Sequence, residues 1–494
     1  MKKLLLISLH DVSIDPREKF SLESVTSSKK YDALFLGIGE YVRPLLNVNA
    51  VNLPNESVRY RDIFGNILFI AKYRKDIEKP FIYIAFLLLP VAFILKSALN
   101  IVSASTSIQK SRHTFKQLST GKMSFLKYSN ASRVRKSDFL IRIFLSVKSY
   151  LVDSKNLGSL IRLTWNIHFH LIHKSSILVR YALERFSEID VLHANDFETS
   201  IAALILKKRY GSRLIYDSQE FFPDSNSVFS SWEKRLYSRL DLKFCHKVDA
   251  VVSVTPQLGF HMKKTYGLKE VFIIPNAYKL EHRPRREKLI VQNKKLRFIF
   301  QGNFSLNRGL ETLVVAWKSQ SLSEVAELHL VGPDNRHKKE IIRLTISLDL
   351  FGKGVFFPEA VLPDHLVYNL ESYDIGVIPY PPIDYNFKFC CPNKLGQYMA
   401  AGIAVMSNEL PFVNSLIEKA SCGFSYKFND EKSIAETVMQ FCNAETLSLL
   451  KGNSKEFYEE VFNWKEIGQR FLFLYQSSGI QTNEKDSGPL AFIV

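Results

Sequence analysis

The hydrophobic pattern of the chain alternates short apolar runs with longer stretches whose apolar positions recur at helical spacing, and the pattern occurs twice. In the first half the expected strands are Lys3–Leu9, Ala33–Leu36, Val191–His193, Arg213–Asp217, Ala250–Val254 and Val271–Pro275. In the second half they are Leu296–Gln301, Ala326–Val331, Val355–Phe357, Ile375–Pro379 and Ala404–Ser407. Apolar strands that alternate with helices predict βαβ units, so we expect a parallel sheet in each half.

A polar stretch separates the two halves. Residues 279–295 read KLEHRPRREKLIVQNKK, which is charged and poor in apolar side chains, as is typical of a linker. We therefore expect an N-terminal Rossmann-like domain over residues 1–278, a second one over residues 296–476 and a tail over residues 477–494. Two doubly wound domains joined in this way place a ligand in the cleft between them, at the carboxyl ends of the strands.

One segment of the first half departs from the alternating pattern. Residues 81–95 contain no charged side chain, and the apolar character continues to Val102 past a single lysine. A membrane-spanning helix needs roughly 20 such residues, so this run is borderline. A single crossing would also put the first strand and the strands after residue 185 on opposite sides of the bilayer. We expect an interfacial helix or a hairpin broken at Pro90, with a buried core helix and a true span as alternatives.

Charge adds a partner to this picture. The 494 residues include 66 Lys and Arg and 49 Asp and Glu, which gives a net charge of +17. Residues 103–190 alone hold 15 of the basic residues and 5 of the acidic ones. A solvated helical face would account for this stretch. A basic stretch beside an apolar one is, however, the two-signal arrangement of peripheral membrane attachment. We therefore expect residues from about 80 to 185 to contact an anionic membrane surface.

Several kinds of site are excluded by the sequence. The five cysteines form neither a C-x-x-C pair nor a zinc spacing, which argues against a disulfide scaffold and indicates a reducing compartment. No P-loop, complete dinucleotide fingerprint, helix-turn-helix or aromatic-basic RNA motif occurs. The first apolar run ends at His10 and Asp11, so it reads as a strand rather than a signal peptide. We expect no nucleic-acid partner, no metal and no cofactor.

Candidate ligand-binding residues follow the first strand of the second half. Gly302 and Asn303 come directly after Leu296–Gln301, and Arg308 precedes a helix that begins near Gly309. A glycine at a strand end lets a ligand approach the backbone, and a helix N-terminus with an arginine suits a diphosphate. The alternative is an ordinary loop with a solvated arginine.

A second group of candidates begins the helix after YPPIDYNFKFCC. Pro392 and Asn393 start this helix, and Lys394 lies in its first turn. A cation in that position opposes the helix dipole, so an anionic ligand is the better explanation for it. Gln397 follows one turn later, and its amide both donates and accepts, as a ribose diol requires.

Several stretches also carry a family resemblance. In the first half they are ISLHDVSIDPR (7–17), DVLHAND (190–196), IYDSQEFFPD (215–224), VDAVVSVTP (248–256) and IIPNA (273–277). In the second half they are FQGNFSLNRGLE (300–311), LVGP (330–333), YDIGVIPY (373–380) and PNKLGQYMAAGIAVMSNELP (392–411). In order and spacing they resemble the retaining, nucleotide-sugar-dependent glycosyltransferases of the GT-B fold and family 4 type. The resemblance is poor over residues 40–185. It implies two Rossmann-like domains that face each other across a cleft.

The resemblance assigns the second-half residues to the donor. Arg308, with Lys394 as a second cation, would hold the diphosphate of a nucleotide-sugar co-substrate without a metal. Gln397 stands where the family usually has a glutamate on the ribose. Glu409 would approach the sugar or the base. Gly302, Asn303, Pro392 and Asn393 complete the implied nucleotide site.

The resemblance assigns the first-half residues to the acceptor and the reacting sugar. Asp196 and Glu220 would border the cleft where acceptor and sugar meet. His193 would be the histidine near the reacting sugar, and Asn276 would face the cleft from a strand end. An acceptor domain that is both apolar and basic suits a lipid-linked glycan.

Some positions depart from the family pattern. The paired glutamates of the family, eight residues apart, are replaced by Phe389 and Gln397, and Asn303 and Gln219 replace an arginine and a histidine. The resemblance still implies retaining sugar transfer to a lipid-linked glycan for surface polysaccharide or lipopolysaccharide synthesis, at the inner face of the cytoplasmic membrane. The alternatives are a GT-B-fold sugar-nucleotide epimerase and a non-catalytic scaffold in a polysaccharide assembly complex, which the missing acids favour.

Overall fold

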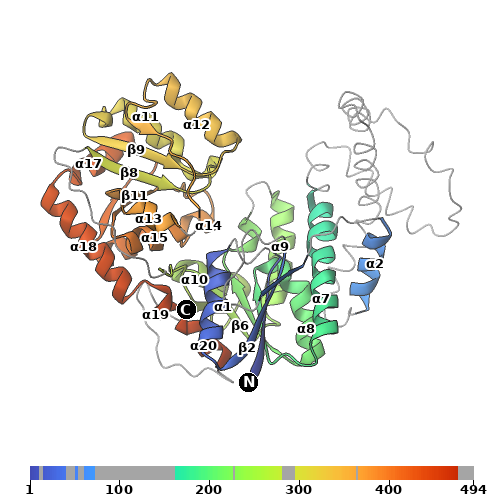
Figure 1. Cartoon of the computed structure of the whole chain (residues 1–494). Helices are drawn as coiled ribbons and strands as arrows, with labels where there is room; N and C mark the ends of the chain where they lie inside the picture. Colours follow the sequence, from blue (N-terminus) through green and yellow to red (C-terminus); the bar gives the residue numbers. More distant parts are fainter. Residues whose placement is uncertain are drawn as a thin grey trace, which may run out of the picture.

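The computed structural model describes residues 1–9, 15–39, 50–53, 60–72, 159, 162–225, 229–280, 295–362 and 365–476. Within this part of the chain, two parallel sheets flanked by helices form two domains, which confirms the predicted fold class (Figure 1). The apolar run 81–102, most of the basic stretch, linker residues 281–294 and the tail lie outside the described residues. No described helix is both long enough and apolar enough to cross a membrane.

The N-terminal sheet has seven described strands in the order β3-β2-β1-β4-β5-β6-β7, and all are paired in parallel. They are β1 (Lys2–Ile7), β2 (Tyr31–Ile38), β3 (Ala50–Leu53), β4 (Val191–Asn195), β5 (Arg213–Ser218), β6 (Ala250–Ser253) and β7 (Phe272–Ile273). Ile7, Leu36 and Leu192 are fully buried, as expected for a parallel sheet covered on both faces. The chain runs from β1 to β2 on one side and later adds β4 on the other. This reversal marks the edge where a ligand binds.

Helices cover both faces of this sheet (Figure 1). They are α1 (Pro16–Ser27), α2 (Tyr60–Ala71), the π-helix η3 (Asn166–Ile172), α7 (His173–Arg185), α8 (Ser200–Tyr210), α9 (Ser231–Cys245) and α10 (Pro256–Tyr266), with short 3₁₀ turns η4 (Phe197–Thr199) and η5 (Phe222–Asp224). Asp15 caps α1 by accepting from the Arg17 and Glu18 backbone N–H groups, and Pro16 follows it at the first helical position. The capping residue therefore fixes where α1 begins, directly beside the end of β1.

The C-terminal sheet has six described strands in the order β10-β9-β8-β11-β12-β13, again all parallel. They are β8 (Leu296–Gln301), β9 (Ala326–Val331), β10 (Val355–Phe356), β11 (Ile375–Ile378), β12 (Ala404–Asn408) and β13 (Gly423–Tyr426). Phe298, Phe300 and Trp317 are buried in its core. The strand order reverses between β8 and β11, so the loops after these two strands flank the expected ligand edge.

The helices of the C-terminal domain include the two whose starts the sequence predicts, near Gly309 and at Pro392–Asn393. The described helices of this domain are α11 (Leu310–Ser319), α12 (Arg336–Ser347), α13 (Leu366–Leu370), α14 (Tyr385–Lys388), α15 (Asn393–Ala401), α16 (Pro411–Ala420), α17 (Glu431–Gln440) and α18 (Ala444–Glu460), with turns η6 (Leu306–Arg308) and η7 (Leu322–Glu324). Asn335, Asp430 and Asn443 cap α12, α17 and α18 through their side chains. Gly309 and Pro392 are the N-cap residues of α11 and α15, and neither supplies a side-chain cap.

The last described helices, α19 (Trp464–Ile467) and α20 (Gln469–Gln476), return to the N-terminal domain. The Trp464 indole donates to the Phe20 carbonyl oxygen at 3.0 Å, and the Tyr475 hydroxyl lies 2.6 Å from Nδ1 of His193. In Figure 1 α20 lies beside α1 and β2. The expected division, with residues 296–476 in one domain, does not include this return of α19 and α20 to the N-terminal domain. The return depends on contacts between residues hundreds of positions apart, which periodicity does not reveal.

A buried ion pair joins these elements at the base of the site. Arg17 donates from Nε and Nη2 to the two carboxylate oxygens of Asp217, each at 2.7 Å, and from Nη1 to the Ile274 carbonyl oxygen at 2.7 Å. The guanidinium also lies 5.1 Å from the ring centroid of Phe471 on α20. Burial would raise the pKa of Asp217, but the Arg17 charge, the hydrogen bonds from Arg17 and the nearby His193 ring lower it to about 2.

We expect Arg17→Met to lower the free energy of unfolding by about 3 to 5 kcal/mol, because it leaves the Asp217 carboxylate buried without its partner. The stabilisation is complete above about pH 4, the usual pKa of an aspartate, and is lost as the pH falls toward 2. Denaturant unfolding at several pH values measures it. Lys19→Met, which removes the partly exposed Lys19–Glu23 pair of the same helix, is the control and should change stability little. Equal effects of the two substitutions would contradict the assignment.

Candidate active site

Arg308 is held at the carboxyl end of β8 by the turn that follows it. Gly309 has a φ of 64°, and a side chain there would overlap the Pro379 carbonyl oxygen at the end of β11. The Arg308 guanidinium lies 4.3 Å from the ring centroid of Tyr380 and 5.7 Å from that of Phe387. Its Nε is buried without a hydrogen-bond partner among the described residues. The side chain is therefore a positioned cation with donors available to an anion.

Lys394 brings a second cation to the same aromatic ring. Its Nζ donates to the Tyr380 hydroxyl at 2.8 Å and lies 5.0 Å from the ring centroid of Phe300. The side chain passes over Gly302, where any Cβ would collide with the lysine ammonium. Gly302 also has a φ of 151°, a backbone conformation that favours glycine. The space beside Gly302, predicted to admit a ligand, is thus occupied by the Lys394 side chain.

The remaining predicted donor residues lie around these two cations. Pro392 is the N-cap residue of α15, and Asn393 is exposed in its first turn. Gln397 is buried on the same helix, whereas Asn303 and Glu409 are exposed in the loops after β8 and β12. These loops all follow strands of the C-terminal sheet at its ligand edge.

Carboxylates line the opposing edge of the N-terminal sheet. Asp196 directly follows β4 with a φ of 56°, an uncommon conformation for a residue other than glycine and one that clusters at functional sites. Its Oδ1 accepts from the Gln219 backbone N–H at 3.3 Å. Burial, together with the negative charges of Glu198 and Glu220, raises the pKa of Asp196 well above its usual value. Three acids from two loops therefore influence one another at this edge.

Glu220 connects the two edges electrostatically. Although Glu220 is exposed, the surrounding protein partly desolvates its carboxylate and, with the charges of Glu198 and Asp384, raises its pKa to about 7. The positive charge of Arg308 acts in the opposite direction. Glu220 belongs to the N-terminal domain and Arg308 and Asp384 to the C-terminal domain. The predicted acceptor and donor residues are thus close enough to interact across the domains.

Two protein-family models match this chain. The model described as Glycosyltransferase Family 4 matches residues 157–282, and the model described as Glycosyl transferases group 1 matches residues 295–444. Together they span more than half of the sequence, one on each domain. The chain is a family 4 glycosyltransferase. Its co-substrate is therefore a nucleotide sugar.

Solved structures share the fold of this glycosyltransferase along nearly its whole length. Sucrose-phosphate synthase from Thermosynechococcus elongatus is 11% identical with a TM-score of 0.59, covering 96% of this chain and 98% of that one. A glycosyltransferase from Rickettsia africae is 12% identical with a TM-score of 0.57, with coverages of 96% and 98%. Anabaena HepE in complex with UDP and glucose is 13% identical with a TM-score of 0.60, with coverages of 97% and 100%. No curated protein matched the sequence. The fold is GT-B.

His193 of the glycosyltransferase does not reach the open edge of the sheet. Its ring is fully buried, with Nδ1 2.6 Å from the Tyr475 hydroxyl and Nε2 3.6 Å from the Asp217 carboxylate. Phe471 covers the ring at a centroid distance of 5.0 Å. The residues of β4 alternate between two covered faces, and His193 faces α20. Its placement supports a structural role rather than the predicted role beside the reacting sugar.

Asn276 does lie between the domains, but its polar groups are already used. Its Oδ1 accepts from Arg17 at 3.0 Å, and its Nδ2 donates to the Cys391 carbonyl oxygen at 3.0 Å. Its backbone N–H also contacts the Cys391 thiol at 3.2 Å. In this arrangement the side chain connects β7 to the segment before α15, instead of facing a ligand.

Several residues of the site were not predicted from the sequence. Tyr380 supports both donor cations, Glu198 belongs to the acidic edge, and Arg17 with Asp217 forms its foundation. Tyr380, Arg17 and Asp217 all lie inside stretches that resemble the family, so the motifs contained the signal. Their roles depend on partners from other loops, which a motif does not identify.

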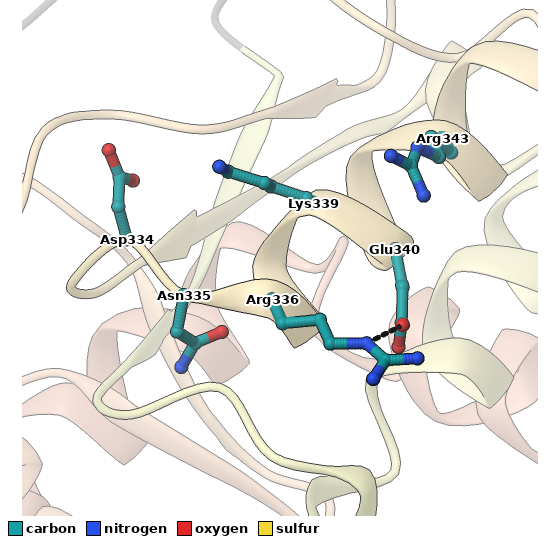
Figure 2. A pocket seen from close by; sticks show the side chains of 6 residues that line it. All are labelled: Asp334, Asn335, Arg336, Lys339, Glu340 and Arg343. Atoms are coloured by element: carbon teal, nitrogen blue, oxygen red, sulfur yellow. Dashed lines mark hydrogen bonds and ion pairs between the residues drawn. The ribbon is translucent and has the colours of Figure 1, made fainter. Parts of the chain in front are cut away.

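A separate hollow of about 410 Å³ lies along α12. Figure 2 shows its six polar lining residues and the ion pair of Arg336 Nε with Glu340 at 2.9 Å. Asn335, at its rim, donates to Asn303 Oδ1 at 3.0 Å. The lining contains no aromatic or aliphatic residue on which a base or sugar could pack. We therefore do not include this hollow in the donor site.

The raised pKa of Glu220 leads to a testable pH dependence. A donor diphosphate and ionised Glu220 compete for the Arg308 charge, so binding favours the protonated acid. We expect the affinity for a nucleotide sugar to fall roughly three- to tenfold as the pH rises through about 7. Calorimetric titration at several pH values measures this, and Glu220→Gln should remove most of the dependence. If Glu220→Gln lost affinity across pH 7 as strongly as the wild type, Glu220 would not be the group that titrates.

Proposed function

We propose that this glycosyltransferase moves a sugar from a nucleoside-diphosphate sugar to a glycan hydroxyl, with Arg308 and Lys394 holding the diphosphate. The observation that supports this most directly is the arrangement of both cations on one tyrosine ring, with no ion pair to either among the described residues. Two cations held apart from carboxylates form a binding site for an anion that carries more than one charge.

The chemistry of the step fits this arrangement. When the bond between the sugar and the phosphate breaks, the departing nucleoside diphosphate gains negative charge. Arg308 and Lys394 stabilise that charge, and the N-terminal N–H groups of α11 and α15 add to the positive potential, because neither helix has a side-chain cap. The chain's own residues supply this stabilisation without a metal in the proposed step.

On the acceptor side we assign an orienting role to Glu220. A carboxyl oxygen of Glu220 accepts a hydrogen bond from the attacking hydroxyl, and an oxygen of the donor phosphate takes the proton as the new bond forms. Attack from the side of the leaving phosphate retains the anomeric configuration, as the family resemblance implies. An inverted anomeric proton coupling in the product would count against retention. Asp196 borders the same edge and, with its raised pKa, is a candidate hydrogen-bond donor to the acceptor.

A uridine nucleotide is the first donor to test. HepE was solved with UDP and glucose and also with UDP-glucose, although its low identity to this chain supports the fold alone. Gln397 lies on α15 one turn beyond Lys394, where its amide can both accept from and donate to a ribose. An amide in place of the usual glutamate keeps this contact neutral.

Replacement of Arg308 tests the donor site. Hydrogen bonds to charged groups contribute about 1.5 to 3 kcal/mol, so Arg308→Ala should weaken the binding of UDP or another nucleoside diphosphate roughly ten- to hundredfold. Calorimetry against a panel of nucleoside diphosphates and their sugars measures it. Arg343→Ala is the matched control, because Arg343 lines the hollow on α12 outside the proposed site. Unchanged binding in Arg308→Ala, or no binding of any panel member by the wild type, would reject the proposal.

We also propose that the acceptor is a lipid-linked glycan of surface polysaccharide or lipopolysaccharide synthesis, reached by peripheral attachment to the inner face of the cytoplasmic membrane. This rests on the uncharged run of residues 81–95 and on the excess of basic residues over 103–190. The uncharged run and most of the basic stretch lie between α2 and α7 in sequence, within the half that also carries the acidic edge of the site.

Vesicle binding tests the membrane proposal. We expect the full-length protein to sediment with vesicles that contain phosphatidylglycerol and to be released as salt screens the basic residues. Pure phosphatidylcholine vesicles are the control and should bind it more weakly, through the apolar run alone. If the protein bound neither kind of vesicle and transferred sugar to lipid-free acceptors at the full rate, the membrane proposal would be rejected.

A further inference from the structure

The short helix α14 belongs to the C-terminal domain but makes specific contacts with the N-terminal domain. The Asn386 side chain accepts from the Phe221 backbone N–H at 2.7 Å and donates to the Phe221 carbonyl oxygen at 3.0 Å. Both ends of one amide are thus used on one residue of the other domain, and Asn386 is buried. A two-point hydrogen bond of this kind fixes orientation as well as distance.

Ring contacts also hold Phe221, from the side of α10. His261 of α10 meets the Phe221 ring edge-on at 4.7 Å and is stacked on Tyr385 of α14 at 3.7 Å. In addition, the Thr255 hydroxyl donates to the Phe389 carbonyl oxygen at 2.8 Å, just beyond the end of α14. Phe221 is therefore enclosed between elements of both domains.

The peptide group that connects Glu220 to Phe221 is held at both ends. Its N–H group, from Phe221, donates to Asn386, and its carbonyl oxygen, from Glu220, accepts from the Ser218 hydroxyl at 2.7 Å. A peptide group is planar, so these two bonds fix the backbone directly after the Glu220 Cα atom. Glu220 is exposed, and within the described residues its side chain forms no hydrogen bond or ion pair, so the backbone sets where its carboxylate can lie.

The other side of α14 faces the donor cation. Phe387, one residue after Asn386, lies 5.7 Å from the Arg308 guanidinium and 6.2 Å from the Tyr380 ring centroid. Asp384 caps the helix by accepting from the Phe387 backbone N–H at 2.9 Å. One turn of helix therefore contacts the residue after Glu220 and the ring beside Arg308.

We propose that Asn386 is a positioning residue that sets Glu220 opposite Arg308 and so couples the acceptor side of the cleft to the donor side. The inference rests on the proposed function, because it assumes that a donor diphosphate binds at Arg308. It assigns Asn386 no contact with substrate. Asn386 acts through the peptide of Glu220 and Phe221.

The experiment measures UDP-glucose affinity by calorimetry at several pH values in the full-length protein. The diphosphate of UDP-glucose has no ionisation near neutrality, so a pH dependence reports on the protein. We expect Asn386→Ala to reduce the roughly three- to tenfold loss of affinity across pH 7 to under about twofold, because Glu220 is no longer held opposite Arg308. Glu220→Gln should behave in the same way, and the double variant should add nothing further.

Two further variants separate positioning from folding. Asn386→Ser replaces the amide with a neutral hydroxyl and adds no titratable group, so it should fold and give an intermediate pH dependence. Tyr458→Phe is the matched control, because it removes hydrogen bonds to the Leu280 N–H and the Tyr278 carbonyl oxygen, away from Glu220. It should keep the wild-type pH dependence at similar thermal stability.

Three outcomes would overturn the inference. The first is a full pH dependence in Asn386→Ala. The second is that Tyr458→Phe loses the pH dependence as Asn386→Ala does. The third is that the effects of Asn386→Ala and Glu220→Gln add up in the double variant. Failure of the proposed function has a different signature, since the wild type would then bind no nucleotide sugar or Arg308→Ala would bind it unchanged. Wild-type binding without any pH dependence overturns the coupling of Glu220 to Arg308 and the inference with it, but leaves the donor site standing.

Discussion

The buried pair of Arg17 and Asp217 is the interaction on which the rest of the site depends. Arg17 lies in the first turn of α1 and Asp217 near the carboxyl end of β5, so their contact joins this helix to the carboxyl edge of the N-terminal sheet. The same guanidinium donates to the Ile274 carbonyl and to Asn276, which in turn binds Cys391 of the other domain. A charge with 1% exposure cannot lose such partners without a large desolvation cost. Arg17 therefore connects α1, through Asn276, to the segment that precedes α15.

Charge is divided between the two edges of the cleft. Arg308 and Lys394 stand on the C-terminal domain, whereas Asp196, Glu198 and Glu220 stand on the N-terminal one, and Arg308 and Glu220 act on each other's charge. In the proposed mechanism a donor diphosphate would replace Glu220 as the counter-charge of Arg308. Glu220 would then be available to an acceptor hydroxyl only after the donor has bound. The proposed mechanism therefore favours an order in which the donor binds first, without any change in fold.

Features set by neighbouring residues could be predicted from the sequence, whereas features set by distant contacts could not. Strand and helix periodicity predicted both sheets, and turn chemistry predicted that Arg308 and Lys394 follow the carboxyl ends of strands in the second sheet, because strand ends and helix starts are local properties. The burial of His193 was missed because its partner Tyr475 lies on a helix that crosses from the other domain. Asn276 was assigned to a ligand although Arg17 and Cys391 use its amide. The motifs located these residues, but only the packing shows what they face.

The departures from the family acids change the charge of the donor edge in a consistent direction. Phe389 and Gln397 contribute no negative charge beside Arg308 and Lys394, and the Phe389 carbonyl is used by Thr255. Within the described part of the chain, neither cation forms an ion pair with a carboxylate. Both cations lie against aromatic faces, which attract a cation without a formal charge and cannot compete strongly with a phosphate. The loss of the acids therefore leaves a site more positive than one with glutamates in those positions. That arrangement favours a diphosphate leaving group, whose negative charge grows during transfer.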